Sequence, residues 1–125
     1  MGVVALDHVQ IAMPKGGEKE AREFYQDILG ISEVLKPAEL AGRGGAWFEN
    51  GKIKIHLGVE ADFRPAKKAH PGFLVSDLPQ LLATLMSKGY AVSEDQSLAE
   101  VKRAFTQDPF GNRVELIQYE SGKRT

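Results

Sequence analysis

The sequence predicts an α+β fold built from two copies of one module, each a strand, a helix and then three strands. Three observations support this. Short β-branched or alternating apolar segments flank one segment of helical periodicity in each half. The order of elements is the same in both halves. The polar segment Glu60–Ala69 contains Pro65 and separates them. We therefore expect one domain, 1–125, with modules over about 4–60 and 69–120 and a linker over about 60–68.

The first module begins with LDHVQIAM (Leu6–Met13), whose alternating apolar residues predict a strand. The next segment, 18–30, has apolar residues at helical spacing and a glycine as a stop signal, which predicts a helix. Asn-Gly after residue 49 is typical of a hairpin between two strands. The three strands expected after the helix are Ile31–Leu35, Gly44–Glu49 and Lys52–Val59.

The second module repeats this order. AHPGFLV (Ala69–Val75) reads as a strand, since Pro71 suits a strand start or edge. Four leucines at helical spacing predict a helix over Leu78–Lys88, and Gly89 ends it. The three strands expected next are Tyr90–Glu94, Lys102–Thr106 and Arg113–Tyr119.

Composition excludes several classes of function. The formal net charge of −1 argues against an electrostatic nucleic-acid binder or membrane binder. No apolar run approaches the roughly 20 residues of a membrane span. The absence of cysteine excludes disulfides, thiolate metal ligands and a cysteine nucleophile. With no signal-peptide pattern at the start, we expect a cytoplasmic protein.

One carboxylate lies at an unusual position near the end of the chain. Residues 108–112, DPFGN, have turn chemistry, and the strand that follows carries Glu115 on the same face as Ile117 and Tyr119. An unpaired buried carboxylate is costly, so it normally finds a cation. Glu115 therefore either binds a metal ion, pairs with a basic side chain such as Arg113 or a lysine of a neighbouring strand, or faces water.

The three histidines and Glu115 fall into register under the repeat. His8 and His70, which we expect in the opening strands, are 62 residues apart, and His56 and Glu115, in the last strands, are 59 apart. If the modules are related by a pseudo-two-fold axis, the four side chains converge. Three imidazoles and one carboxylate are suitable ligands for a divalent transition metal. Hydrogen-bonded structural histidines are the alternative interpretation.

At this point the chain resembles the vicinal oxygen chelate superfamily of glyoxalase I, bleomycin resistance proteins, fosfomycin-modifying thiol transferases and extradiol dioxygenases. The similar segments, which cover almost the whole chain, are LDHVQIAMP, AREFYQDILGI, KIHLGVE, HPGFLVSDL and, most specifically, DPFGNRVELI. The resemblance implies paired βαβββ modules in a U-shaped mixed sheet with helices on the outer face, and a homodimer. It also implies metal ligands in the first and last strands of each module, at the positions of His8, His56, His70 and Glu115.

The resemblance leaves two functions open. The first is a metal-dependent lyase, isomerase or dioxygenase, in which Fe, Mn, Ni, Zn or Co chelates vicinal oxygens of a small substrate and stabilises an oxyanion. The second is a metal-free protein that binds small molecules, as bleomycin resistance proteins do. Glyoxalase I relatives usually carry a carboxylate where this chain has His56, so the expected proton acceptor is Glu115.

The residues expected to contact a substrate flank two turns. Trp47 and Phe48 precede the first turn, and because neighbouring strand residues alternate, one of them faces the cavity and one the core. Phe105 precedes the second turn, and Arg103 on the same face is a candidate for an anionic substrate group. The linker adds an expected positively charged lip: Phe63, Arg64, Lys67 and Lys68.

Overall fold

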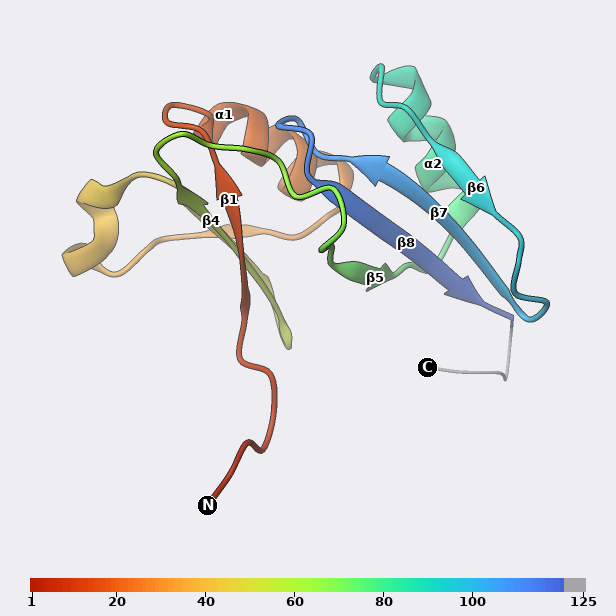
Figure 1. Cartoon of the computed structure of the whole chain (residues 1–125), viewed down its shortest axis with the longest axis horizontal. Coiled ribbons are helices and arrows are strands. Elements are labelled where there is room, and N and C mark those ends of the chain that lie inside the picture. The colour runs from red at the N-terminus through yellow and green to blue at the C-terminus, as the bar shows by residue number, and fades with distance from the viewer. Residues whose placement is uncertain (121–125) are drawn as a thin grey trace. The chain divides into compact units, whose positions relative to one another are not determined.

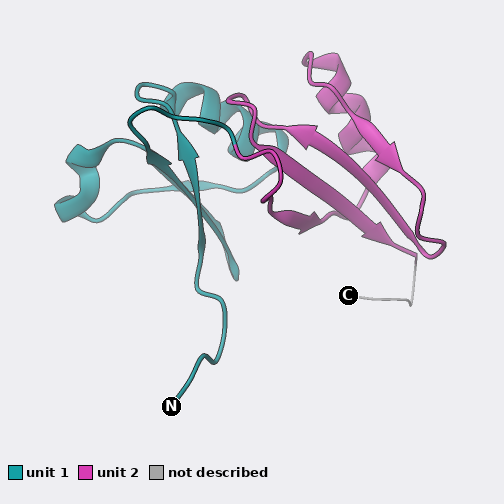
Figure 2. Cartoon of the chain, in the orientation of Figure 1, with its two compact units in different colours: residues 1–65 teal, residues 66–125 magenta. Residues whose placement is uncertain are grey.

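The computed structural model describes residues 1–120, which form two compact units, Met1–Pro65 and the part of Ala66–Thr125 that ends at residue 120 (Figure 2). The boundary after Pro65 falls inside the predicted linker. Each unit contains one four-stranded sheet of mixed direction and one main helical segment. The predicted α+β class with two βαβββ modules is confirmed.

Unit 1 forms a sheet in the order β1-β4-β3-β2. β1 (Val9–Met13) is parallel to β4 (Ile53–Val59), and β3 (Ala46–Asn50) pairs antiparallel with both β4 and β2 (Glu33–Val34). The remaining elements are helical: α1 (Glu18–Ala21), its continuation as a π-helix, η1 (Arg22–Ile28), and a 3₁₀ helix, η2 (Ala38–Arg43).

The two faces of this sheet differ in chemistry. One face is apolar and lies against the helical segment: Phe48 is fully buried, and its ring stacks on that of Tyr25 with centroids 5.6 Å apart. Met13 and Phe24 are also fully buried. The other face carries Gln10, which pairs in register with His56. The apolar face therefore forms the core of unit 1, and the polar face is left for the candidate site.

Several boundaries in unit 1 differ from the prediction, and β2 covers only Glu33–Val34 of the expected Ile31–Leu35. β1 begins at Val9, so His8 precedes the strand rather than lying within it. β3 begins at Ala46, because Gly44 and Gly45 both adopt positive φ angles, 75° and 83°, that a regular strand does not allow. A Cβ atom on Gly45 would also collide with a backbone carbonyl of β4. The helix η2 was not predicted, because it is a short 3₁₀ segment of six residues, too short to show a helical periodicity.

Unit 2 forms a second sheet in the order β5-β8-β7-β6 (Figure 1). The parallel pair joins β5 (Gly72–Leu74) to β8 (Arg113–Tyr119), and β7 (Val101–Gln107) pairs antiparallel with β8 and with β6 (Ser93–Asp95). Helix α2 (Leu78–Ser87) begins at Asp77, whose side chain accepts a hydrogen bond from the backbone N–H of Gln80.

Helix α2 provides the buried side of unit 2. Its residues Leu78, Leu82 and Leu85 are buried, as the leucine spacing predicts, and β8 contributes Val114 and Leu116. The other face of β8 carries Arg113, Glu115 and Ile117, since alternate residues of a strand point to opposite faces.

Hydrogen bonds of the turn before β8 connect the start of unit 2 to its last strand. The buried carboxylate of Asp108 accepts hydrogen bonds from the backbone N–H of Phe110 and from both the backbone and the side-chain N–H of Asn112, each at 2.9 Å. The Oδ1 atom of Asn112 accepts a bond from the N–H of Ala66, also at 2.9 Å. β8 matches its predicted bounds.

Two strands of unit 2 are shorter than predicted or shifted. β5 starts after Pro71, which has no N–H to donate, so His70 lies two residues before the strand. β6 starts at Ser93, three residues later than expected. His8 and His70 thus occupy equivalent positions just before the opening strand of each unit.

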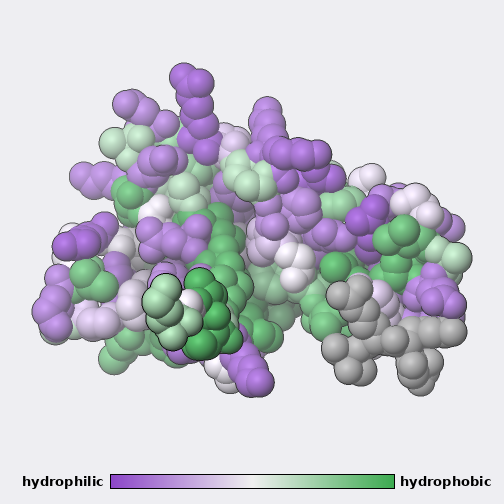
Figure 3. Space-filling model, turned by 60° about the horizontal axis from the view of Figure 1, so that its bottom comes forward, coloured by the Kyte–Doolittle hydropathy of each residue, from purple (hydrophilic) through white to green (hydrophobic). Residues whose placement is uncertain are grey.

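Four of the nine exposed large apolar side chains of the described residues lie ahead of β1. Met1, Val3, Val4 and Leu6 all have most of their surface accessible. Figure 3 shows apolar side chains among hydrophilic ones on the face turned to the viewer. In the described part of the chain, no helix combines the length and the apolar character needed to cross a membrane.

Candidate metal and substrate site

Three rings form a continuous stack on the polar face of unit 1. The indole of Trp47 lies 3.8 Å from the imidazole of His56, with planes 3° apart, because these residues pair directly across β3 and β4. The ring of His8 lies 4.5 Å from His56 on a plane tilted by 22°. His56 is only 4% exposed, so the stack fixes the orientation of its ring.

Two carboxylates hold the imidazoles of this stack. The Nε2 atom of His56 lies 2.7 Å from Oε2 of Glu49, and the Nδ1 atom of His8 lies 2.9 Å from Oδ2 of Asp7. The hydrogen bond from His8, followed by the charge of Lys54, lowers the pKa of Asp7. An ionised carboxylate only accepts, so Nδ1 of His8 carries a proton and Nε2 is the candidate metal-binding nitrogen of this ring.

Glu49 was missed by sequence reasoning. It lies two residues after Trp47 in β3 and therefore on the same face of the sheet. Counting alternate residues from Trp47 could have found it. The carboxylate that this chain lacks at position 56 is thus present on the neighbouring strand, in contact with His56.

Unit 2 brings together His70 and Glu115. The Nδ1 atom of His70 donates to the backbone carbonyl of Lys68 at 2.8 Å, since a carbonyl oxygen only accepts. Its Nε2 atom lies 3.0 Å from Oε1 of Glu115. Register places Glu115 between Gly72 of β5 and Phe105 of β7. Because Gly72 has no side chain, β5 leaves the space beside the carboxylate of Glu115 unfilled.

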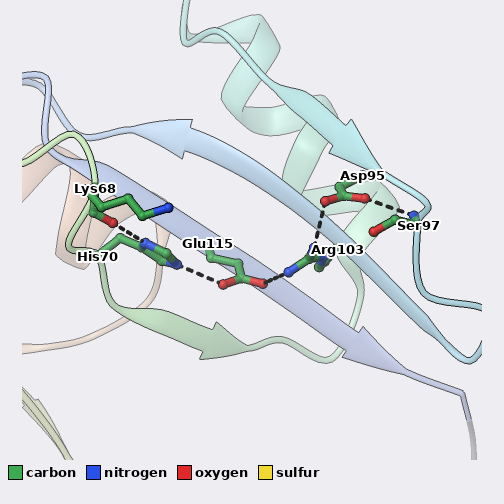
Figure 4. Close-up of polar contacts among 6 residues, drawn as sticks. All are labelled: Lys68, His70, Asp95, Ser97, Arg103 and Glu115. Atoms are coloured by element: carbon green, nitrogen blue, oxygen red, sulfur yellow. Dashed lines mark hydrogen bonds and ion pairs between the residues drawn. The ribbon is translucent and has the colours of Figure 1, made fainter.

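Arg103 is the basic partner of Glu115. Its guanidinium donates at 3.1 Å to Oε2 of Glu115 and at 2.7 Å to Oδ2 of Asp95 (Figure 4). These contacts, the bond to Glu115 first, raise the pKa of Arg103. Hydrogen bonds from Ser97, backbone first, and the charge of Arg103 lower the pKa of Asp95. Arg103 is therefore occupied by two carboxylates rather than free for a substrate anion.

The predicted site residues fall into two groups, one in each unit. His8 and His56 lie together in unit 1, and His70 and Glu115 lie together in unit 2. Trp47 joins the first group, whereas Phe48 is fully buried against the helical segment. Phe105 lies edge-on to His70, with ring centroids 5.6 Å apart. Within the described residues, no three His, Asp or Glu side chains form a group that could hold a metal ion.

The donor atoms nevertheless have the chemistry of metal ligands. In many metal sites, the ligating imidazole donates its second N–H to a carboxylate or a backbone carbonyl, which fixes the tautomer. His8 has the first arrangement and His70 the second, at equivalent positions of the two modules. Imidazole and carboxylate donors of this kind are suitable ligands for a divalent transition metal.

The fold and these histidine and carboxylate pairs define a two-module α+β protein with candidate metal ligands just before the first strand and within the last strand of each module. The family model of the Glyoxalase/Bleomycin resistance protein/Dioxygenase superfamily matches residues 5–116. The chain therefore belongs to this superfamily, and the resemblance inferred from the sequence motifs is confirmed. The search of the curated proteins found no match.

Solved structures of this fold include both proteins of the glyoxalase family and proteins linked to antibiotics. A protein from Bacillus anthracis assigned to the glyoxalase family is 43% identical, with a TM-score of 0.89 over 96% of this chain and 98% of that one. The fosfomycin resistance protein FosX from Listeria monocytogenes is 12% identical, with a TM-score of 0.77 over 99% and 100%. The antibiotic-binding protein TnmS3 from Streptomyces sp. CB03234 is 18% identical, with a TM-score of 0.72 over 96% and 99%. The last two show likeness of fold.

Proposed function

We propose that the chain is a metal-dependent enzyme of lyase, isomerase or dioxygenase type that acts on a small substrate with oxygens on adjacent atoms. Its proposed metal ligands are the four residues in register: His8, His56, His70 and Glu115. The observation that carries the proposal is the matched anchoring of His8 and His70, whose Nδ1 atoms donate to Asp7 and to the carbonyl of Lys68, while Nε2 of His70 points to Glu115.

The metal, when bound, would supply a Lewis acid for an oxyanion on the substrate. The protein supplies the rest. Glu115 is the proposed proton acceptor, and its Oε2 atom is held by the guanidinium of Arg103. Trp47 offers an aromatic surface beside His56 on which a substrate can pack. Phe105 places its ring beside His70 and closes one side of the carboxylate.

The proposal is tested by metal content. The untagged chain is incubated with Fe, Mn, Ni, Zn or Co salts, desalted and analysed by elemental mass spectrometry. We expect one bound ion per set of four ligands. The Glu115→Gln variant should bind the metal roughly 100-fold more weakly, the size of effect typical for metal-site residues. Glu94→Gln, which changes an exposed glutamate in β6 of the same unit, is the matched control and keeps the metal.

A metal-free small-molecule-binding protein is the second candidate. The observation favouring it is that three candidate donors already have protein partners: Glu115 contacts both His70 and Arg103, and Nε2 of His56 contacts Glu49. The stack of Trp47, His56 and His8 beside two carboxylates would suit an aromatic or cationic compound. A chain that takes up none of the five metals would support this function instead. The homodimer stays a prediction, which sedimentation equilibrium can test.

A further inference from the structure

Arg113 is a cation with no carboxylate partner among the residues that the structure describes. It lies on the same face of β8 as Glu115, two residues earlier, and its guanidinium carbon lies 4.1 Å from the centroid of the Phe105 ring. Stacking on Phe105 holds the planar guanidinium in place while its N–H groups stay available at the edge. Among the described residues, no Asp or Glu side chain lies within ion-pair distance of Arg113. Arg103, in contrast, is held by two carboxylates.

A second cation, Lys67, is anchored beside Arg113 by backbone hydrogen bonds. The N–H of Ala66 donates to Oδ1 of Asn112, and the N–H of Arg113 donates to the carbonyl of Ala66, both at 2.9 Å. Asn112 is in turn held by the buried carboxylate of Asp108. The hydrogen bonds of this turn therefore fix the main chain at Ala66, immediately before Lys67.

These residues line a cavity of about 420 Å³, which we name the Lys67–Arg113 cavity. Its lining comprises Lys67, Ala91, Val92, Ser93, Phe105, Thr106, Gln107 and Arg113. The hydroxyl of Thr106 already donates to the carbonyl of Ala91 at 2.8 Å. The exposed side chains of Ser93 and Gln107 can donate hydrogen bonds to a ligand. Two cations, two neutral donors and no acidic residue among the lining groups favour a negatively charged occupant.

We propose that the Lys67–Arg113 cavity is a binding site for an oxyanion group, carboxylate or phosphate-like, of a small molecule. Guanidinium and ammonium groups bind such oxygens through charge-assisted hydrogen bonds, roughly twice as strong as neutral ones. Phe105 contacts both Arg113 and His70, so the cavity adjoins the proposed metal ligands of unit 2. The assignment of the anion to the enzyme's substrate rests on the proposed function, whereas anion binding itself does not.

The test is a titration of the full chain with inorganic phosphate and, separately, with sodium acetate, followed by proton–nitrogen NMR of backbone amides and arginine side chains. We expect shifts that saturate at the amides around Lys67 and Ser93 and at the guanidinium of Arg113. The Lys67→Gln variant should bind roughly fivefold more weakly and Arg113→Gln roughly tenfold, as expected for one charge-assisted bond. Lys88→Gln, an equal loss of charge at the exposed end of α2, should bind like the wild type.

Each outcome of the titration tests one part of the proposal. Tighter binding of phosphate than acetate identifies a tetrahedral anion, and the reverse identifies a carboxylate. The proposal is overturned if neither anion shifts these signals, or if Lys67→Gln and Lys88→Gln weaken binding equally. Lys67 is exposed and lies outside the strands, so its substitution tests the cavity even if Arg113→Gln unfolds. Anion binding without metal uptake would refute the proposed function alone, and metal uptake without anion binding would refute the cavity alone.

Discussion

Replacing Asn112 with alanine should destabilise the chain more than any surface asparagine change. Asn112 is 2% exposed, and its side chain donates to the carboxylate of Asp108 and accepts from the N–H of Ala66. A hydrogen bond to a charged group contributes about 1.5–3 kcal/mol, and a neutral one about 1 kcal/mol. We therefore expect Asn112→Ala to lower the free energy of unfolding by about 3 kcal/mol.

The matched control is Asn50→Ala in the hairpin of unit 1. Asn50 also makes two side-chain hydrogen bonds, to the carbonyl of Gly30 at 2.7 Å and from the N–H of Ser32 at 3.3 Å, but it is exposed. Water can replace these bonds, so we expect a cost of about 1 kcal/mol or less. The measurement is urea unfolding followed by far-ultraviolet circular dichroism, because fluorescence of Trp47 reports on unit 1. Equal costs for the two variants would refute the assigned role of the turn.

Three further substitutions test other parts of the structure. Gly45→Ala should cost about 3 kcal/mol, since its Cβ would collide with the carbonyl of Leu57 at a positive φ angle, and thermal unfolding measures the loss. Arg103→Met should lower the urea midpoint less in a Glu115→Gln background than in the wild type, because only its bond to Asp95 is then left to lose, and a double-mutant cycle isolates the pair with Glu115. The pKa of Asp95 is lowered in the folded state, so the stabilisation from its carboxylate is present above the unfolded pKa of about 4. This stabilisation is lost as the pH falls through the lower folded pKa. Asp95→Asn should therefore flatten the acid side of the profile of stability against pH.

Most of the fold could be predicted because the relevant signals are local. Alternating apolar residues located β4 and β8 to within one residue, and leucine spacing with Gly89 located α2. The errors fall where backbone geometry overrides pattern. Gly44 and Gly45 delay β3, and the strand-like residues at 69–71 stay outside the sheet because Pro71 lacks a donor.

The residues of the site could be predicted from the sequence better than the contacts between them. The repeat placed His8 and His70 at equivalent positions, and the structure gives both the same Nδ1 anchoring. Register could not reveal that Glu115 pairs with Arg103, because that contact depends on the length and path of the arginine side chain across β7 and β8. The same cause left Glu49 unrecognised as the partner of His56. Strand alternation sets the face of a side chain and not the atom that it reaches.

The most direct measurement of the proposed metal site is long-range proton–nitrogen NMR of the imidazole nitrogens during titration with Zn²⁺. The account predicts that the Nε2 signals of His8 and His70 change together and that both rings keep their Nδ1 protons, held by Asp7 and the carbonyl of Lys68. Unchanged imidazole signals at saturating Zn²⁺, or binding through Nδ1 of either ring, would contradict it.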